Sequence, residues 1–151
     1  MPHFELTTRI AAPLERVFDA CLDVEVHTGS MAQSGERTVG GKSSGHLGLG
    51  DRVTFQARHL GIRWRLTARV IEIDRPEHFA DEQEHGPFKR WRHAHHFTPD
   101  GNGGTVMRDV VDFASPIGPL GALVDKLVLH HYMISLIERR NQYIKALLES
   151  P

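Results

Sequence analysis

The sequence has few of the features that mark several common protein classes. Cys21 is its only cysteine, so an internal disulfide and a cysteine-based zinc site are both excluded. The formal net charge is only −1, which gives no basic footprint for nucleic acid. The longest apolar runs are a few residues long, too short to span a membrane. We therefore expect a cytoplasmic protein with no integral membrane segment and no nucleic-acid partner.

The residues that are present fit one globular domain. The chain has 151 residues, of which 40% are hydrophobic and 25% are charged. These values are ordinary for a soluble protein, and we predict a single domain over residues 1–151. Histidine departs from this ordinary composition, because the chain contains 11 histidines. That count raises the question of metal binding.

Two neighbouring segments alternate with a period of two, which is typical of β-strands. One face of each strand combines apolar side chains with polar ones. This face holds Trp91, His93, His95 and Phe97 in residues 91–97, and Thr105, Met107, Asp109, Val111 and Phe113 in residues 105–113. A face that only completed a solid core would hold aliphatic residues, whereas a face that lines a ligand cavity can include polar groups. We therefore predict that both segments line a cavity.

The other periodicities predict a fixed order of strands and helices. Residues 3–10 alternate as a strand, and helical spacing begins after Pro13, with residues 23–28 either extending that helix or forming a second one. Further strands are predicted at 37–39, 52–59, 61–73, 79–84 and 88–97, with a bulge near Val70-Ile71. The rest of residues 29–51 reads as a loop. Residues 119–149 carry one apolar stripe and predict a long amphipathic helix. Short connections make the sheet antiparallel, so the class is α+β.

A row of polar side chains is predicted to cross this sheet. With simple hairpin registers, Asp81 and Asp109 lie opposite His93 on its two sides, and Gln83 and His95 lie beside them. The row could be a buried network that fixes register, a subsite for the polar end of a ligand, or an acid/base centre. A metal site of His93, His95 and Asp109 has less support, because no further ligand spacing accompanies the histidines. We expect neither a metal nor a cofactor.

Four local patterns resemble one known superfamily. They are Phe79-x-Asp81-x-Gln83-x-x-Gly86-Pro87-Phe88, Trp91-x-His93-x-His95-x-Phe97, Thr105-x-Met107-x-Asp109-x-Val111-x-Phe113 and Pro116-x-Gly118-Pro119-Leu120-Gly121. With the element order, they resemble a bacterial branch of the START/Bet v 1-like superfamily, also called SRPBCC or polyketide cyclase/dehydrase-like proteins. The resemblance covers nearly the whole chain.

This resemblance implies a helix-grip fold. In that fold a curved seven-stranded antiparallel sheet wraps around a long C-terminal helix, and two short helices follow the first strand. The resemblance also implies a deep pocket between the sheet and the helix. Members of the superfamily bind lipids, sterols, polyketides or other hydrophobic molecules, and some catalyse cyclisation or dehydration.

The leading functional hypothesis is that the protein binds or carries a small hydrophobic molecule in this pocket. The residues expected to contact it are Phe55, Trp64, Leu66, Asp81, Gln83, Trp91, His93, His95, Asp109, Val111, Leu127, His131 and Ile134. The glycine-rich stretch 40–50 is expected to border the entrance. One alternative is a cyclase or dehydratase that uses His93 with Asp81 or Asp109 as acid/base. Another is a module that binds a macromolecule. We expect a monomer or a homodimer.

Overall fold

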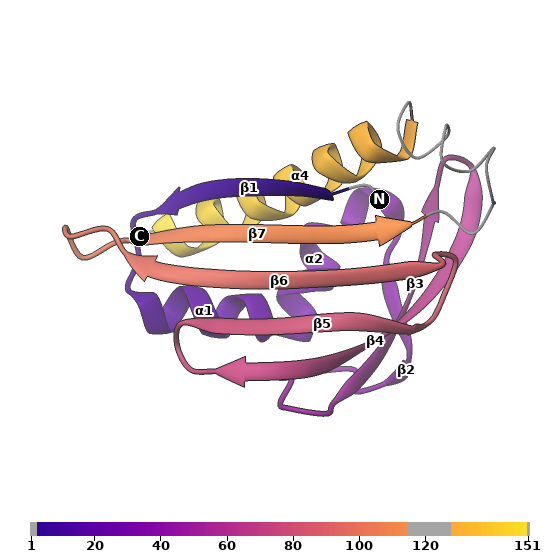
Figure 1. Cartoon of the computed structure of the whole chain (residues 1–151), viewed down its shortest axis with the longest axis horizontal. Helices are drawn as coiled ribbons and strands as arrows, with labels where there is room; N and C mark the ends of the chain where they lie inside the picture. Colours follow the sequence, from indigo (N-terminus) through magenta and orange to yellow (C-terminus); the bar gives the residue numbers. More distant parts are fainter. Residues whose placement is uncertain (1–2, 115–127, 151) are drawn as a thin grey trace.

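The computed structural model describes residues 3–114 and 128–150. In these residues the chain forms a seven-stranded antiparallel sheet (Figure 1). The strands are β1 (His3–Ile10), β2 (Arg37–Gly41), β3 (Arg52–His59), β4 (Ile62–Asp74), β5 (His78–His85), β6 (Arg90–Pro99) and β7 (Thr105–Ala114). Their spatial order is β1-β7-β6-β5-β4-β3-β2. The first strand therefore pairs with the last, and the others follow as a meander of neighbours.

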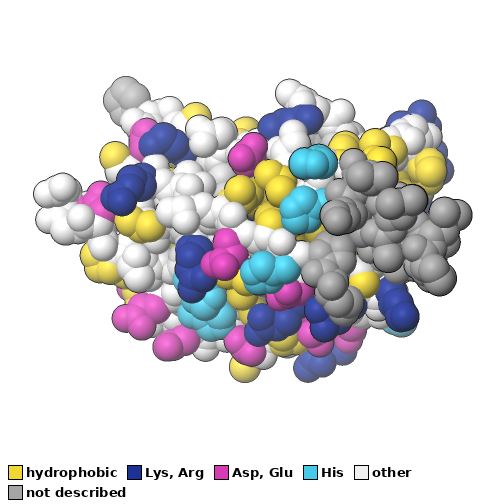
Figure 2. All heavy atoms as spheres, turned by 45° about the horizontal axis from the view of Figure 1, so that its top comes forward, with side chains coloured by type: hydrophobic (Ala, Val, Ile, Leu, Met, Phe, Trp, Pro, Cys, Tyr) yellow, Lys and Arg dark blue, Asp and Glu magenta, His cyan; other side chains and the backbone are white. Residues whose placement is uncertain are grey.

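The helices lie on one face of the sheet (Figure 1). They are α1 (Leu14–Leu22), α2 (Val24–Ser30), the short 3₁₀ helix η1 (Ala32–Ser34) and α4 (His130–Glu149). The sheet curves around α4, so the α+β class and the helix-grip fold expected from the sequence are confirmed. No helix among the described residues is both long and apolar enough to cross a membrane. On the face shown in Figure 2, charged side chains of both signs are intermixed.

Local signals in the sequence account for most of these elements. Asp23 separates α1 from α2, because its Oδ1 accepts hydrogen bonds from the backbone N–H groups of Glu25 and Val26 at 2.9 and 3.1 Å. A side-chain N-cap of this kind starts a new helix, so residues 23–28 form a second helix and do not extend the first. The β3–β4 hairpin turns at Leu60 and Gly61, which both have positive φ. The expected bulge in β4 is present between Val70 and Glu72.

Strand β2 and the long C-terminal helix have bounds in the described residues that differ from the predicted ones. The strand β2 extends to Gly41, beyond the predicted residues 37–39. The predicted helix over 119–149 is described only from its middle onward, as α4 from His130 to Glu149. Its first half, including Pro119 and Leu127, lies outside the described residues.

The core consists of two apolar clusters that lie toward opposite ends of the long strands. One cluster contains Phe18, Phe97 and Met107, together with Ile144 of α4. The other contains Trp91, Val111 and Phe113, together with Met133, Leu136 and Ile137 of α4. Along β6, β7 and α4, the residues between the two clusters are polar and buried: His93, His95, Asp109, Arg140 and Asn141. The fold thus places a buried polar layer between two halves of an apolar core.

Candidate ligand-binding site

A cavity of about 180 Å³ lies between the concave face of the sheet and helices α1, α2 and α4. Its wall is mostly apolar. The apolar part includes Leu22, Val24, Met31, Leu47, Val53, Phe55, Ala57, Trp64, Leu66, Ala68, Val70, Phe79, Phe88, Trp91, Met133, Leu136 and Ile137. Polar side chains enter the wall at a few positions, among them Asp81, His93, His95, Glu36 and Arg140. An apolar pocket with a few convergent polar groups is the usual form of a small-molecule site.

Asp109 is the centre of the polar layer. Its side chain is fully buried, and its Oδ1 accepts hydrogen bonds from His93 Nε2 at 2.7 Å and from Arg140 Nη1 at 3.2 Å. Its Oδ2 accepts one from Asn141 Nδ2 at 2.7 Å, and this amide also reaches Thr8 Oγ1 at 3.2 Å. The network joins β1, β6, β7 and α4. A buried carboxylate is tolerated only when it is paired in this way.

A second hydrogen-bonded chain runs from Arg140 toward the cavity. Arg140 Nη2 lies 3.4 Å from His95 Nδ1, and His95 Nε2 lies 3.2 Å from Asp81 Oδ2. Guanidinium can only donate and an ionised carboxylate can only accept. His95 can therefore accept at Nδ1 from Arg140 and donate from Nε2 to Asp81, and its Nδ1 also lies 3.3 Å from Asp109 Oδ1. Asp81 is the most exposed acid of the network, with 22% of its side chain accessible.

The pairing of β6 with β7 corrects one prediction. Asp81 pairs with His93 across β5 and β6, as expected. Asp109, however, pairs with His95 and not with His93, whose partner in β7 is Val111. The hairpin closes at Pro99 and Thr105, which shifts the register by two residues from the expected one. A shift of two keeps every side chain on its face, so Asp109 still points inward and reaches His93 diagonally.

Burial and charge set the protonation of the network. Burial lowers the pKa of His93 to about 4. Burial alone would raise the pKa of the Asp109 carboxyl, but the hydrogen bond from His93 and the charge of Arg140 hold it well below its usual range. Burial likewise opposes ionisation of Asp81, but the hydrogen bond from His95 lowers its pKa. At neutral pH His93 is therefore neutral, and both aspartates are ionised.

These shifts predict how stability depends on pH. Because the folded-state pKa of His93, about 4, is below the value of 6.5 for a free histidine, the unfolded chain binds the proton first as the pH falls. The stability from a neutral His93 is complete above pH 6.5 and is lost between pH 6.5 and 4, at up to about 1.4 kcal/mol per pH unit. We expect His93→Gln to have a shallower slope of unfolding free energy in this window, measured by urea unfolding at several pH values. Identical slopes would contradict the assignment.

The cavity brings together about half of the residues predicted to contact a ligand. Phe55, Trp64, Leu66, Asp81, Trp91, His93 and His95 all lie in its wall. Their contact with a ligand remains a prediction. Asp109 and Val111 are fully buried behind the wall, in the polar layer and in the apolar core. Leu127 lies outside the described residues.

Three other residues are placed differently from the prediction. The amide of Gln83 is bonded to the backbone of Phe88, with Nε2 donating to the carbonyl at 2.7 Å and Oε1 accepting from N–H at 3.1 Å. It braces the β5–β6 turn and does not face the cavity. His131 is exposed, because the apolar stripe of α4 passes through Met133 and Ile137 and leaves His131 on the outer side. Ile134 packs at the margin of the second apolar cluster.

Sequence reasoning missed the polar residues of α4. Arg140 and Asn141 are 3% and 1% exposed, and they provide most of the donors to Asp109. A signal was present, since residue 140 is three positions after Ile137 and four before Ile144, on the same helical stripe. Charged and polar residues are mostly exposed, so residue type gives no reason to expect either residue to be buried. Glu36, which precedes β2 and lines the cavity, was also missed.

Asp81, His93 and His95 form the one group of the described chain whose ligand atoms could together hold a metal ion, within 4.8 Å of one another. The sequence suggested Asp109 as the third ligand of such a site, whereas in the structure the third residue is Asp81. The two imidazole rings are stacked, with centroids 3.8 Å apart and planes 23° from parallel. Their lone pairs therefore do not converge on one point. A guanidinium beside His95 further opposes a cation, so the geometry favours a hydrogen-bonded network. That the protein needs no metal stays a prediction.

Comparison with known proteins places the chain in a family. Residues 1–149 match the family described as polyketide cyclase / dehydrase and lipid transport. The chain belongs to this family, and the START/Bet v 1-like superfamily expected from the sequence is confirmed. No curated protein matches the sequence significantly.

Several solved structures share the fold. A crystal structure of the protein TTHA0849 from Thermus thermophilus has a TM-score of 0.74 and 22% identity, covering 99% of this chain and 100% of that one. A START superfamily protein from Mycobacterium smegmatis has a TM-score of 0.73 and 14% identity, covering 97% of each chain. Ara h 8.0201 has a TM-score of 0.62 and 15% identity, covering 94% of this chain and 96% of that one. At these identities the likeness concerns the fold alone.

Proposed function

We propose that this protein binds a compact hydrophobic molecule in the cavity between its sheet and α4. The observation that carries the proposal is the cavity itself: about 180 Å³, with an apolar wall interrupted by a few polar groups. A 150 Å³ apolar cavity in a protein can hold a benzene molecule, so this one has room for a one- or two-ring compound. Membership in a family whose description includes lipid transport agrees with the proposal.

The energetics of the wall support a ligand role over a purely structural one. A solid core is packed to the density of an organic crystal, and an empty apolar cavity loses those contacts at a cost of about 24 cal/mol per Å³. An apolar ligand that fills the space regains them. Aromatic side chains such as Phe55, Trp64 and Trp91 provide broad faces for such contacts.

The alternative of a cyclase or dehydratase has weaker support. Asp109 orients His93 as a carboxylate orients a general base, but a pKa of about 4 makes His93 a poor base at neutral pH. Cys21 also lines the cavity, but burial raises the pKa of its thiol to about 11, so it is not a ready nucleophile. Binding therefore explains the site better than catalysis does.

Naphthalene is a suitable first probe, because it is apolar and has two rings. We expect saturable binding to the purified protein, measured by isothermal titration calorimetry. Ala68→Phe places a ring in the cavity wall and should weaken naphthalene binding at least about tenfold, equivalent to 1.4 kcal/mol. Ala57→Phe provides an independent filling variant on β3, in case the first one unfolds.

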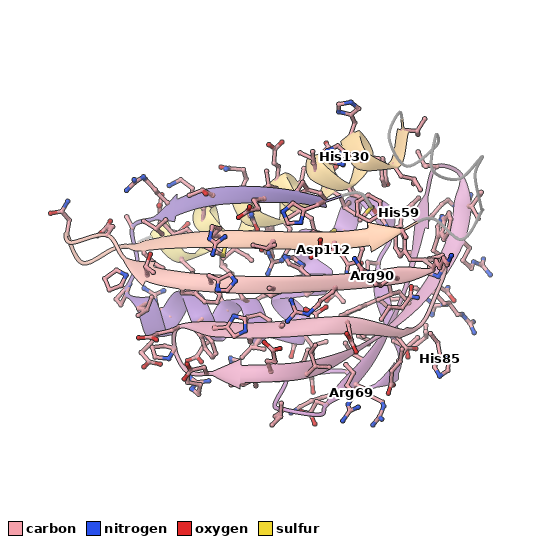
Figure 3. All side chains as sticks on the ribbon, viewed as in Figure 1. His59, Arg69, His85, Arg90, Asp112 and His130 are labelled. Carbon is pink, nitrogen blue, oxygen red and sulfur yellow. The ribbon has the colours of Figure 1, made fainter. Side chains whose placement is uncertain are left out.

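Arg69→Phe is the matched control. It introduces the same ring one residue further along β4, where the side chain is exposed and points away from the sheet (Figure 3). This variant should bind naphthalene as the unmodified protein does. The proposal is wrong if the unmodified protein does not bind naphthalene, or if both folded filling variants bind it with unchanged affinity.

A further inference from the structure

The polar end of the cavity presents acceptors. His93 donates its Nε2 proton to Asp109, whose ionised carboxyl can only accept. The neutral imidazole therefore has its lone pair on Nδ1, and His93 lines the cavity as an acceptor. A ligand group with a proton to donate can satisfy this atom in place of water.

Asp81 adds a second acceptor at the same place. Its Oδ2 accepts one hydrogen bond from His95, whereas a carboxylate has about four lone-pair sites. The side chain lies in the cavity wall and is 22% accessible, so acceptor capacity remains for a ligand. Asp81 pairs with His93 on adjacent strands. The two acceptors can therefore meet one head group.

The donors of Arg140 and Asn141 are largely engaged within the network. Arg140 Nη1 donates to Asp109 at 3.2 Å and to Asn141 Oδ1 at 2.8 Å, and Nη2 faces His95. Asn141 Nδ2 donates to Asp109 and Thr8. Arg140 also lines the cavity, and its charge interacts with both Asp109 and Asp81. Two carboxylates face a single guanidinium, so the network as a whole keeps a negative charge at this end of the cavity.

Glu36 is an acidic residue in another part of the cavity wall. Its side chain is 7% exposed, and Oε1 lies 2.9 Å from His27 Nε2, at ion-pair distance but outside hydrogen-bond geometry. Within the described residues, this buried oxygen has no hydrogen-bond partner. The His27 ring packs on Phe55, with centroids 4.3 Å apart. Three acidic residues, Asp23, Glu36 and Asp81, therefore border the cavity.

We propose that Asp81 and His93 form a subsite for a hydrogen-bond donor head group, a hydroxyl or a protonated amine, and that this subsite rejects carboxylate ligands. The inference rests on the proposed function, because it specifies which hydrophobic molecules the cavity accepts. A hydroxyl or ammonium would satisfy both acceptors. A carboxylate would place like charges together in a poorly solvated space and leave the acceptors unpaired.

A series of probes with one ring system and different head groups tests this selectivity at pH 7. We expect 2-naphthol or 2-naphthylmethylammonium to bind the unmodified protein at least about fivefold more tightly than naphthalene, as one satisfied hydrogen bond implies. We expect 2-naphthoate to bind at least about tenfold more weakly than the better of these two. Comparing the affinities of 2-naphthol and 2-naphthylmethylammonium shows which donor the subsite prefers. Tighter binding of either one than of naphthalene supports the subsite.

Two variants identify the residue responsible. Asp81→Asn keeps the shape but replaces the charge with an amide that can donate, so it should reduce the discrimination against 2-naphthoate at least about fivefold. Asp112→Asn is the matched control. It alters another Asp–His pair, with His3 Nδ1 at 2.8 Å from Asp112 Oδ1, on the outer face of β7 (Figure 3), and should leave the discrimination unchanged.

The possible failures can be told apart. If naphthalene does not bind, both the proposed function and the subsite are wrong. If naphthalene binds but the charged and uncharged probes bind equally well, the cavity remains a binding site and the subsite is wrong. An unchanged probe ratio in folded Asp81→Asn also overturns the role of Asp81. The comparison in the unmodified protein stands even if that variant does not fold.

Discussion

Asp109→Ala should lower the free energy of unfolding by about 3–5 kcal/mol. Arg140 is 3% exposed, and its charge is balanced by Asp109 within the polar layer. Removing the carboxyl leaves a buried guanidinium without its ionic partner and removes the acceptor of His93 and Asn141. Domains are typically stable by only about 5–15 kcal/mol, so the variant should be close to unfolding at room temperature. Urea unfolding followed by circular dichroism measures the effect.

A double substitution separates the cost of breaking the pair from its net contribution. Asp109→Leu combined with Arg140→Met replaces both charges with apolar side chains, and such replacements of buried pairs are often neutral or stabilising. We expect the double variant to be more stable than either single one, with a coupling free energy of at least about 1 kcal/mol. Asp112→Ala, on the half-exposed outer side of β7, should cost less than about 1 kcal/mol. Equal effects of Asp109→Ala and Asp112→Ala would refute the role of the network.

Ending the chain after residue 129 should abolish cooperative folding. This truncation removes α4, which contributes Met133, Leu136 and Ile137 to one apolar cluster and Ile144 and Leu148 to the other. It also removes Arg140 and Asn141, which leaves Asp109 without most of its donors. We expect an insoluble product, or a soluble one with no sigmoidal thermal transition.

Single substitutions on α4 show how much of the effect of the truncation comes from the buried face of this helix. Ile144→Ala, at a residue 1% exposed, should cost about 2–5 kcal/mol. Leu147→Ala, at a residue 45% exposed on the other side of the helix, should cost within about 0.5 kcal/mol. A truncated protein that unfolds cooperatively would show that the sheet and the short helices form a stable domain without α4.

The candidate site could be predicted from the sequence only to a certain point. The alternation in β6 and β7 correctly predicted that His93, His95 and Asp109 point inward, because a strand presents successive side chains to opposite faces. It could not predict the partners. The expected pairing of Asp109 with His93 was wrong by two residues, because the five residues between Pro99 and Thr105 close the hairpin in another register. Gln83 shares the right face but is bonded to the Phe88 backbone at a turn, which no periodicity reveals.

The sequence by itself determined the elements and their faces: the alternating strands, the hairpin at Leu60-Gly61, the cap at Asp23 and the apolar stripe of α4. These follow from interactions between residues close in the chain. The tertiary structure alone decided the register of β6 with β7, and it brought Arg140 and Asn141 to Asp109, 31 and 32 residues away. It also placed Asp81 and His93 together in the cavity wall. Burial creates these features, because a charge removed from water must find its partners among residues that only folding brings together.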